Sequence, residues 1–545
     1  MQGNFEHSGV LVRFMLRRER ITSAIWIVLL VLFSIVLAPG IAEMFPDQTV
    51  RDSFAVSLNN PIMISMMGPI YGVENYTVGA MYGGMMLLWY IIAVGAMNIF
   101  LVVRHTRADE EGGRAEVVRS LPVGRLANIH ATMITAVIVN GILGLFTGLG
   151  LAVCGLDSMG FGGSMLYGLA TCASGLVFAA VTMLFCQLSS NTSGATGLSF
   201  LTLGVFYMIR AAGDANGSEF LACLSPLGLV QRSQVYVGNY IWPSLILLLQ
   251  SAVIMIAAYK LNSIRDLGQG FIAAKPGRRN ASPVLSSSFG LSHRLLRGMI
   301  IAWFIIMFML GASYGSVIGD IGTFIQDSPE YLAIIGVPVE VLPFMSDADK
   351  EMLIIKSFGT FVTIMMTLIC FVPVLNSVLR IRSEERDSRS EHVLARVVSR
   401  SKYLAGYVII AFAASILMQF ATAAGLYMSA ASVAGENNPF VFSELLNAHL
   451  NFLPALWVMI GIAVVFIGVF PKATGVIWGY YGFICFTSFI GAMVLPDWML
   501  KLSPMAYIPE QPFEKMTPLI VLTVIAVVLC IKGFVFYRKR DMITG

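Results

Sequence analysis

Charged residues are scarce in this chain of 545 residues: 12% are Asp, Glu, Lys or Arg, whereas 57% are hydrophobic. The mean hydropathy is +0.79. A soluble protein of this length must cover its surface with many more polar and charged side chains, so the composition excludes a soluble globular protein. The chain is therefore expected to lie in a membrane.

The motifs of several catalytic classes are absent as well. No Gly-x-x-x-x-Gly-Lys-Ser/Thr loop occurs, so the chain cannot hold nucleotide phosphates by that device, and the six His include no His-Glu-x-x-His. The seven Cys show no Cys-x-x-Cys spacing, which disfavours a metal or disulfide framework. We expect no catalytic, cofactor-binding or metal-binding residue on this chain, and no nucleic acid among its partners.

What the chain does contain is a series of long runs with no charge or a single basic residue. A helix needs about 20 residues to cross the ~30 Å hydrocarbon core of a bilayer, and twelve segments come near that length. They cover residues 21–42, 80–103, 129–153, 164–187, 194–212, 241–259, 298–318, 357–378, 404–432, 451–470, 474–496 and 517–537. The predicted fold is an all-α polytopic membrane protein with twelve transmembrane helices.

The basic residues predict the orientation of these helices. With both termini in the cytoplasm, the inner segments hold 27 of the 35 Lys and Arg but only 12 of the 31 Asp and Glu. Those segments are residues 1–20, 104–128, 188–193, 260–297, 379–403, 471–473 and 538–545. Because cytoplasmic loops carry an excess of Lys and Arg, we expect a multi-pass protein of the plasma membrane with both termini inside.

A charged segment interrupts this apolar chain twice. RADEEGGRAEVVRSLPVGR fills residues 107–125, and RSEERDSRSEHVLARVVSR fills residues 382–400, 275 positions later. Seven of the nineteen positions are identical without a gap, and the same offset relates Arg265 and Asp266 to Arg540 and Asp541. Self-similarity at a fixed spacing indicates an internal repeat.

The repeat predicts two fused halves of six helices each. Residues 1–270 form the first transmembrane half, residues 271–297 a cytoplasmic linker with an elbow segment, and residues 298–545 the second half. Because six is an even number, both halves enter and leave the membrane on the same side. The halves are therefore expected to be parallel repeats rather than inverted ones.

Each charged segment is expected to form a short helix with an apolar side. Val117, Val118 and Leu121 fall on one side of the first, and Val393, Leu394 and Val397 on one side of the second. Pro122 is expected to end the first helix early, so that the second runs longer. Such a helix can lie among lipid headgroups. The acidic cluster Asp109, Glu110 and Glu111 favours a folded cytoplasmic partner instead, because an anionic leaflet repels it.

Several motifs together resemble a known family. The acidic pair with Arg-x-Glu and a closing basic residue recurs in both segments, Ser225 to Gly228 read SPLG, and Arg265 to Gly270 read RDLGQG. This combination resembles ABC type-2 permeases of the polyketide-antibiotic exporter family, the tetronasin-type exporters. The resemblance implies outer re-entrant elements near Ser225 and Ser503, and interfacial elbow helices at residues 5–20 and about 284–297.

The resemblance also implies that the charged segments dock on ATPase subunits. In the first half the implied coupling residues are Glu110, Glu111, Arg114, Glu116, Val117, Val118, Leu121 and Arg125, and in the second Glu385, Arg389, Glu391, Val393, Leu394, Val397 and Arg400. The partner would be a soluble ABC ATPase in two copies, which would carry ATP and Mg because this chain has no nucleotide-binding motif.

The expected function is thus that of a membrane-spanning permease of an ATP-driven exporter. Few fixed charges along the spans suit lipophilic or amphiphilic cargo such as antibiotics, although the pattern assigns no substrate-binding residue. The alternative is an ion-coupled multidrug transporter, but the predicted spans have no Asp or Glu in their interiors to carry an ion. A non-transporting assembly or signalling protein of the membrane is a third possibility.

Overall fold

The computed structural model describes residues 2–59, 61–266, 268–272, 280–316, 345–435, 438–488, 495–509 and 516–541, together with Leu332, Val337 and Leu342. Over these ranges the chain forms α-helices and short 3-10 helices, and no strand. The chain divides into two compact units, Met1–Gly277 and Arg278–Gly545.

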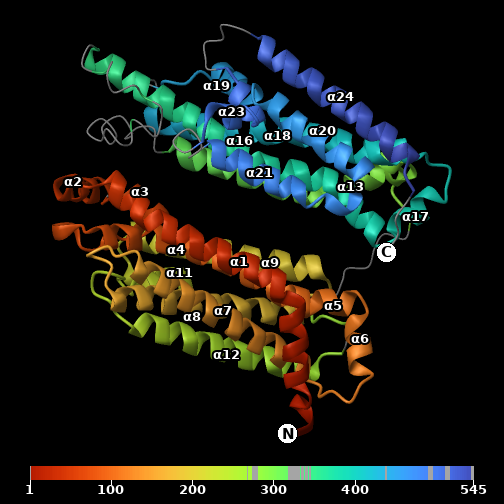
Figure 1. Cartoon of the computed structure of the whole chain (residues 1–545), viewed down its shortest axis with the longest axis horizontal. Helices are drawn as coiled ribbons and strands as arrows, with labels where there is room; N and C mark the ends of the chain where they lie inside the picture. Colours follow the sequence, from red (N-terminus) through yellow and green to blue (C-terminus); the bar gives the residue numbers. More distant parts are fainter. Residues whose placement is uncertain are drawn as a thin grey trace. The chain divides into compact units, whose positions relative to one another are not determined.

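Unit 1 is a bundle of long helices with short helices at both ends (Figure 1). Its long helices are α1 (Ser8–Met44), α4 (Val78–His105), α7 (Ala127–Val153), α8 (Phe161–Leu188), α9 (Thr192–Ala215) and α12 (Trp242–Ile264). The short elements are η1 (Gln2–Phe5), α2 (Gln48–Leu58), α3 (Pro61–Met67), η2 (Val73–Asn75), α5 (Arg107–Glu111), α6 (Arg114–Arg119), α10 (Glu219–Cys223) and α11 (Pro226–Gln231).

Helix α8 is the centre of unit 1, because it packs against α4, α7, α9 and α12. Its closest approach is to α7, where a Cβ added at Gly168 would lie 2.1 Å from the carbonyl oxygen of Gly144. Small residues let helix backbones approach in this way, and in a bilayer such packing takes the place of a hydrophobic driving force between helices.

Unit 2 contains η3 (Pro283–Ser286), α13 (Ser288–Gly315), α16 (Asp347–Arg386), α17 (Arg389–Leu394), α18 (Arg400–Ala434), α19 (Phe442–Leu450), α20 (Leu453–Val469), η6 (Pro471–Ala473), α21 (Val476–Phe486), α23 (Asp497–Leu500), η8 (Pro504–Tyr507) and α24 (Thr517–Lys539). Helices α13 and α18 pack closely along Gly311, Gly315 and Gly425. Helices α20 and α24 form the other close pair, with Gly468 and Gly533 at their contact.

Eleven helices of the described residues are long and apolar enough to cross a membrane. Each coincides with one of the predicted spans. The remaining prediction, residues 474–496, begins as the 11-residue apolar helix α21, but residues 489–494 lie outside the described residues. The twelfth span therefore stays a prediction, as does the arrangement of the two halves as parallel repeats. Residues 273–279 of the predicted linker also lie outside the described part.

The two segments expected to be elbow helices are continuous with the spans that follow, because α1 and α13 run unbroken from Ser8 and Ser288. Figure 1 shows that the N-terminal part of α1 runs in a different direction from the rest of the helix. The location of both segments at the membrane interface stays a prediction. One local expectation was wrong, because the helices in the charged segments are equal in length: α6 and α17 have six residues each. Pro122 follows the end of α6 and does not shorten it.

Candidate functional site

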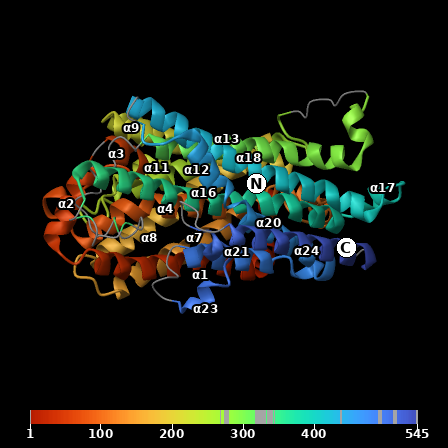
Figure 2. The same cartoon turned by 90° about the horizontal axis from the view of Figure 1, so that it is seen from above.

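Each charged segment lies at one end of its own bundle. In unit 1, α5 and α6 lie at the end that holds the N-terminal part of α1, and α2 and α3 lie at the opposite end (Figure 1). In unit 2, α17 and the C-terminus of the chain share one end (Figures 1 and 2). The chain turns between α5 and α6 at Gly113, whose φ of 71° favours glycine. In unit 2, α16 runs unbroken to Arg386, so its last turn takes the place of α5.

A buried cluster of three charges anchors the segment in unit 1. Glu110 accepts two hydrogen bonds from Arg265, at 2.9 and 2.5 Å, and one from Arg107 at 2.7 Å. The side chains of Arg107, Arg265 and Glu110 are only 1%, 3% and 8% exposed. Arg107 also donates to the carbonyl oxygen of Cys186 at the end of α8. The cluster therefore ties α5 to the ends of α8 and α12.

Unit 2 contains the corresponding cluster at the corresponding positions. Glu385 pairs with Arg540 at 2.5 Å and with Arg382 at 3.5 Å, and the hydroxyl of Tyr537 donates to it at 2.9 Å. Each member except Tyr537 stands 275 positions after its counterpart in unit 1. This second cluster is less enclosed, because Arg382 is 19% and Arg540 10% exposed.

The basic residue that closes each charged segment makes the same backbone contact in both units. Arg125 donates to the carbonyl oxygen of Arg265 at 3.1 Å, and Arg400 donates to that of Arg540 at 2.6 Å. The arginine that pairs with the glutamate thus also accepts a hydrogen bond through its backbone. Both ends of each charged segment are therefore fastened to the last helix of their own unit.

A second carboxylate holds the turn that follows. In unit 1, Asp109 accepts from Arg114 at 2.8 Å and from both terminal nitrogens of Arg18 at 2.7 and 3.0 Å, which ties α5 to α1. In unit 2, Glu384 contacts Arg389 at 3.5 Å and Arg380 at 2.8 Å. Glu111 accepts from the backbone N–H of Thr192, at the N-terminus of α9, where the helix dipole favours a negative charge.

The predicted apolar side of α6 is divided by the structure. Val118 packs inward against a cluster that includes Leu11, Met15 and Ala127. Val117 and Leu121 face outward, with 67% and 58% of their surface exposed. The expectation that all three residues share one face was therefore wrong, because α6 ends at Arg119, before Leu121, and its adjacent residues Val117 and Val118 point in different directions.

The remaining predicted residues divide in a similar way. In unit 2, Val393 and Leu394 are half-buried, whereas Val397 is fully exposed. Glu116 and Glu391 are exposed, and so are Arg114 and Arg389. The predicted set thus contains buried or half-buried residues, among them Glu110 and Glu385, and a larger group that is exposed, which includes Glu111 and Arg125. Only the exposed group is available to a partner.

Sequence reasoning missed the partners of the anchors. Arg18, Thr192, Arg265 and Arg540 were not among the predicted site residues. A signal for two of them existed, because Arg265 and Arg540 are related by the same offset as the charged segments. Residues that repeat together at one offset are expected to keep their contacts together. Arg18 and Thr192 were not identified through this offset, so only the structure identifies them.

The opposite end of unit 1 holds a second buried cluster. Asp214 pairs with Arg232 at 2.9 Å and lies 3.7 Å from Arg210, while Arg232 donates to the hydroxyl of Tyr71. Burial raises the pKa of Tyr71 to about 12. This cluster supports the region of the predicted re-entrant element, where Ser225 caps α11 by accepting from the N–H of Leu227. Ser503 caps η8 in unit 2 in the same way.

The described residues contain no group of His, Cys, Asp and Glu that could hold a metal ion. Eleven apolar helices long enough to span a bilayer, with charged anchors at the bundle ends, define a multi-pass membrane protein. Comparison with known families then specifies its kind.

The chain belongs to the family described as Multidrug efflux system permease Rv1217c, C-terminal domain, which matches residues 10–259 and 285–538. The two matched ranges begin 275 residues apart, which is the offset of the internal repeat. The chain is also similar to the Multidrug efflux system permease protein Rv1217c of Mycobacterium tuberculosis, with 32% identity over 541 residues that cover 98% of this chain and 94% of that protein. The protein is thus a transmembrane permease of a multidrug efflux family. The expected likeness to tetronasin-type exporters stays a prediction.

Proposed function

We propose that this chain is the membrane-spanning subunit of an ATP-driven exporter, that it acts as two parallel six-helix halves, and that a separate soluble ABC ATPase docks on residues 107–125 and 382–400. The observation that carries the proposal is the recurrence of one anchoring pattern at both charged segments. A segment that only rested on lipid headgroups would not need buried ion clusters on its inner side.

The anchoring suits a segment that transmits motion. In unit 1 the segment is fastened to α1 through Asp109, to α9 through Glu111, and to α8 and α12 through the cluster around Glu110. Charge-assisted and bidentate hydrogen bonds are the strong and geometrically specific ones. A push on the exposed surface of α6 would therefore act on the ends of four long helices. This is the arrangement that rigid-body movement of a bundle requires.

The proposed docking surface of unit 1 is the outward face that Glu116, Val117 and Leu121 form. Two exposed aliphatic side chains beside a carboxylate suit an apolar groove with a basic rim. Full burial of each aliphatic side chain is worth about 1.5–3 kcal/mol. Two docking surfaces on one chain predict two ATPase copies, which would carry the ATP and Mg.

Ion-coupled transport is the less favoured alternative. Ion carriers need ionisable groups along the transport pathway. The buried acidic residues of the described helices are Glu19, Asp214, Glu384 and Glu385, and each contacts at least one arginine or histidine. All four lie outside the segments 21–42, 194–212 and 357–378 that the sequence predicts to span the bilayer in α1, α9 and α16. They are placed to hold structure, not to carry ions across.

The proposed cargo is lipophilic or amphiphilic and includes antibiotics, and the expected location is the plasma membrane with both termini in the cytoplasm. Support for the cargo comes from the multidrug efflux relative and from the apolar composition of the spans.

The proposal is tested by purifying the protein from its native membrane and identifying soluble ATPases that accompany it. We expect the pair Val117→Ser and Leu121→Ser to reduce ATPase recovery and ATP-dependent export while the permease inserts normally. The matched control is the pair Val153→Ser and Phe161→Ser. It also removes two exposed apolar side chains, but these lie at the C-terminus of α7 and the N-terminus of α8, away from α6. Transport in vesicles under a proton gradient alone, without ATP, would refute the proposal.

A further inference from the structure

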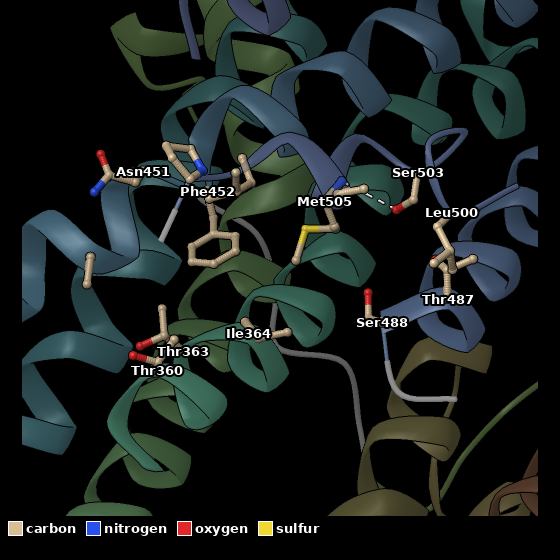
Figure 3. Close-up of a pocket in the computed structure, with 14 residues that line it drawn as sticks. Thr360, Thr363, Ile364, Asn451, Phe452, Thr487, Ser488, Leu500, Ser503 and Met505 are labelled. Atoms are coloured by element: carbon tan, nitrogen blue, oxygen red, sulfur yellow. Dashed lines mark hydrogen bonds between the residues drawn. The ribbon is translucent and has the colours of Figure 1, made fainter. Parts of the chain in front are cut away.

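Unit 2 contains a pocket of about 310 Å³ that no part of the proposed docking surface uses. Helix α16, the junction of α19 and α20, the end of α21 and residues 500–509 enclose it (Figure 3). Its volume is near the lower end of the range of roughly 300–1,000 Å³ that small-molecule sites occupy. The pocket is therefore large enough for a compact organic molecule.

The backbone beside this pocket differs between the units. The candidate span Phe442–Val469 is interrupted at Asn451 and Phe452, where α19 ends and α20 begins. In unit 1 the long helix that follows α7, α8, is unbroken over 28 residues. Irregular backbone inside a membrane span is tolerated where it is buried in protein or lines a cavity, and discontinuous helices form substrate sites in many transporters. The break between α19 and α20 therefore lies at a cavity, as the breaks in such substrate sites do.

The lining combines apolar side chains with neutral polar ones. Ile364, Phe452 and Met505 are among the apolar members. The described lining residues include no charged side chain, and the polar ones are Thr360, Thr363, Asn451, Thr487, Ser488 and Ser503. Figure 3 shows the two threonines of α16 and Ser503 on different sides of the pocket. A molecule in the pocket would meet polar groups from several directions.

Three hydroxyl groups of the lining already donate their hydrogens within the protein. Thr360 donates to the carbonyl oxygen of Lys356 at 3.1 Å, Thr363 to that of Gly359 at 2.8 Å, and Ser488 to that of Ile484 at 2.9 Å. Because each hydroxyl hydrogen is engaged, these oxygens offer a ligand their acceptor lone pairs. They suit O–H and N–H groups of a ligand rather than its acceptors.

Asn451 does not add a donor to these acceptors. Its side-chain Nδ2 is buried and has no hydrogen-bond partner among the described residues, but because it has almost no accessible surface it does not open to the pocket. The hydroxyl oxygens are therefore the polar groups that the lining offers, and they match a ligand that carries O–H or N–H groups.

We propose that this pocket binds an uncharged amphiphile that carries hydroxyl or N–H groups, and that it is a cargo site in the second unit. The assignment to cargo rests on the proposed export function. An anion is disfavoured because the lining offers mainly acceptors, and a cation is disfavoured because the described lining residues include no carboxylate to offset its desolvation. Apolar side chains would cover the hydrocarbon part of the molecule.

The test uses the full chain in lipid nanodiscs without an ATPase, so that binding is measured apart from export. The probes are diazirine derivatives of octanol, octanoic acid and octyltrimethylammonium, with photolabelled residues mapped by mass spectrometry. We expect saturable labelling of the pocket by the alcohol, and weak labelling by the acid and by the cation. Equal labelling by the alcohol and the acid would overturn the proposal.

Matched variants separate the site from the fold. Thr360→Val and Thr363→Val keep the side-chain shape but remove an acceptor, and each should weaken alcohol binding roughly three- to tenfold, as expected for one lost hydrogen bond. Thr523→Val is the control, because Thr523 makes the same kind of backbone hydrogen bond at 2.8 Å in α24, away from the pocket. Ala448→Trp should fill the pocket and abolish labelling. Labelling that persists in Ala448→Trp, or that falls equally in Thr523→Val, would contradict the site.

Export is measured separately with the ATPase restored. Export without ATP, with alcohol labelling of the pocket intact, would refute the proposed function but not the binding site. ATP-dependent export without labelling of the pocket would refute the binding site but not the proposed function.

Discussion

The buried cluster around Glu110 gives the sharpest prediction on stability. Glu110→Gln keeps the shape of the side chain but removes the charge that faces Arg107 and Arg265, whose side chains are 1% and 3% exposed. Removal of one partner from a buried ion pair costs about 3–5 kcal/mol, because the remaining charge stays desolvated. Two arginines share this glutamate, so we expect the upper part of that range.

The second unit provides a graded comparison. Glu385→Gln removes the corresponding charge, but Arg382 and Arg540 are more exposed and the contact with Arg382 is 3.5 Å long. Water can screen these arginines, so we expect a smaller loss of about 1–3 kcal/mol. Glu116→Gln changes an exposed residue and should alter stability by no more than about 0.5 kcal/mol.

A buried free cysteine in each unit allows the unfolding of that unit to be measured separately. Cys186 in unit 1 and Cys370 in unit 2 are fully buried free thiols. Variants that keep only one of them, with the other cysteines replaced by alanine, would be heated in detergent with a thiol-reactive dye. We expect Glu110→Gln to expose Cys186 earliest and Glu385→Gln to affect Cys370.

The reasoning has a clear refutation. If Glu110→Gln and Glu116→Gln shift the exposure of Cys186 equally, the cluster does not hold the segment. A positive control is the triple variant Arg107→Met, Glu110→Leu and Arg265→Met, because replacement of a whole buried ion cluster by apolar residues is often neutral. It should recover much of the stability that Glu110→Gln loses.

Three further predictions concern packing and topology. Gly175→Ala should destabilise unit 1 by about 1–3 kcal/mol in the same dye assay. The new Cβ would lie 2.0 Å from Oδ1 of Asn140 and break the reciprocal Asn98–Asn140 amide pair. Gly141→Ala is the control, because its Cβ would meet no atom within 4 Å and should not change stability. Val118→Ser should destabilise unit 1 and Val117→Ser should not, since only Val118 packs on the core; equal effects would contradict this. Cysteines placed at exposed Ser53 and Val441 should react with an impermeant thiol reagent outside intact cells, and cysteines at exposed Glu116 and Arg396 should not; the reverse pattern would invert the topology.

The membrane helices could be predicted from the sequence because the bilayer imposes one strong requirement. Each span must be about 20 residues long and nearly free of charge, and this pattern located eleven helices to within a few residues at most ends. The larger differences occur where helices continue beyond the bilayer. Helix α16, for example, extends from the predicted residues 357–378 to Asp347 and Arg386, because charged residues outside the hydrocarbon do not end a helix.

The candidate site was harder to predict because its contacts are long-range. The sequence marks Glu110 and Arg265 as repeated residues, but it does not say that a residue in α5 pairs with one 155 positions away. Exposure was also ambiguous. Val117 and Val118 are adjacent in the sequence, and only the packing of α1 and α7 decides that Val118 is the inner one.

The division between anchors and exposed residues has a consequence for how the two segments work. The anchors Glu110 and Arg125 are identical to their counterparts in unit 2, whereas the exposed apolar positions of unit 1 differ from theirs. At the 275-residue offset, Val117 corresponds to His392, Leu121 to Arg396 and Pro122 to Val397. The outward face is therefore mainly apolar in unit 1 and more basic in unit 2.

Two identical ATPase grooves could not fit both faces equally well. A groove lined for Val117 and Leu121 would leave His392 and Arg396 against an apolar surface, and burial of an unpaired charge is costly. The two docking events are thus expected to differ in affinity and in salt dependence, with the unit 2 contact weakening more as ionic strength rises. Under the proposed function, the repeat would preserve how each segment is held, and its divergence would give each segment a different surface for a partner.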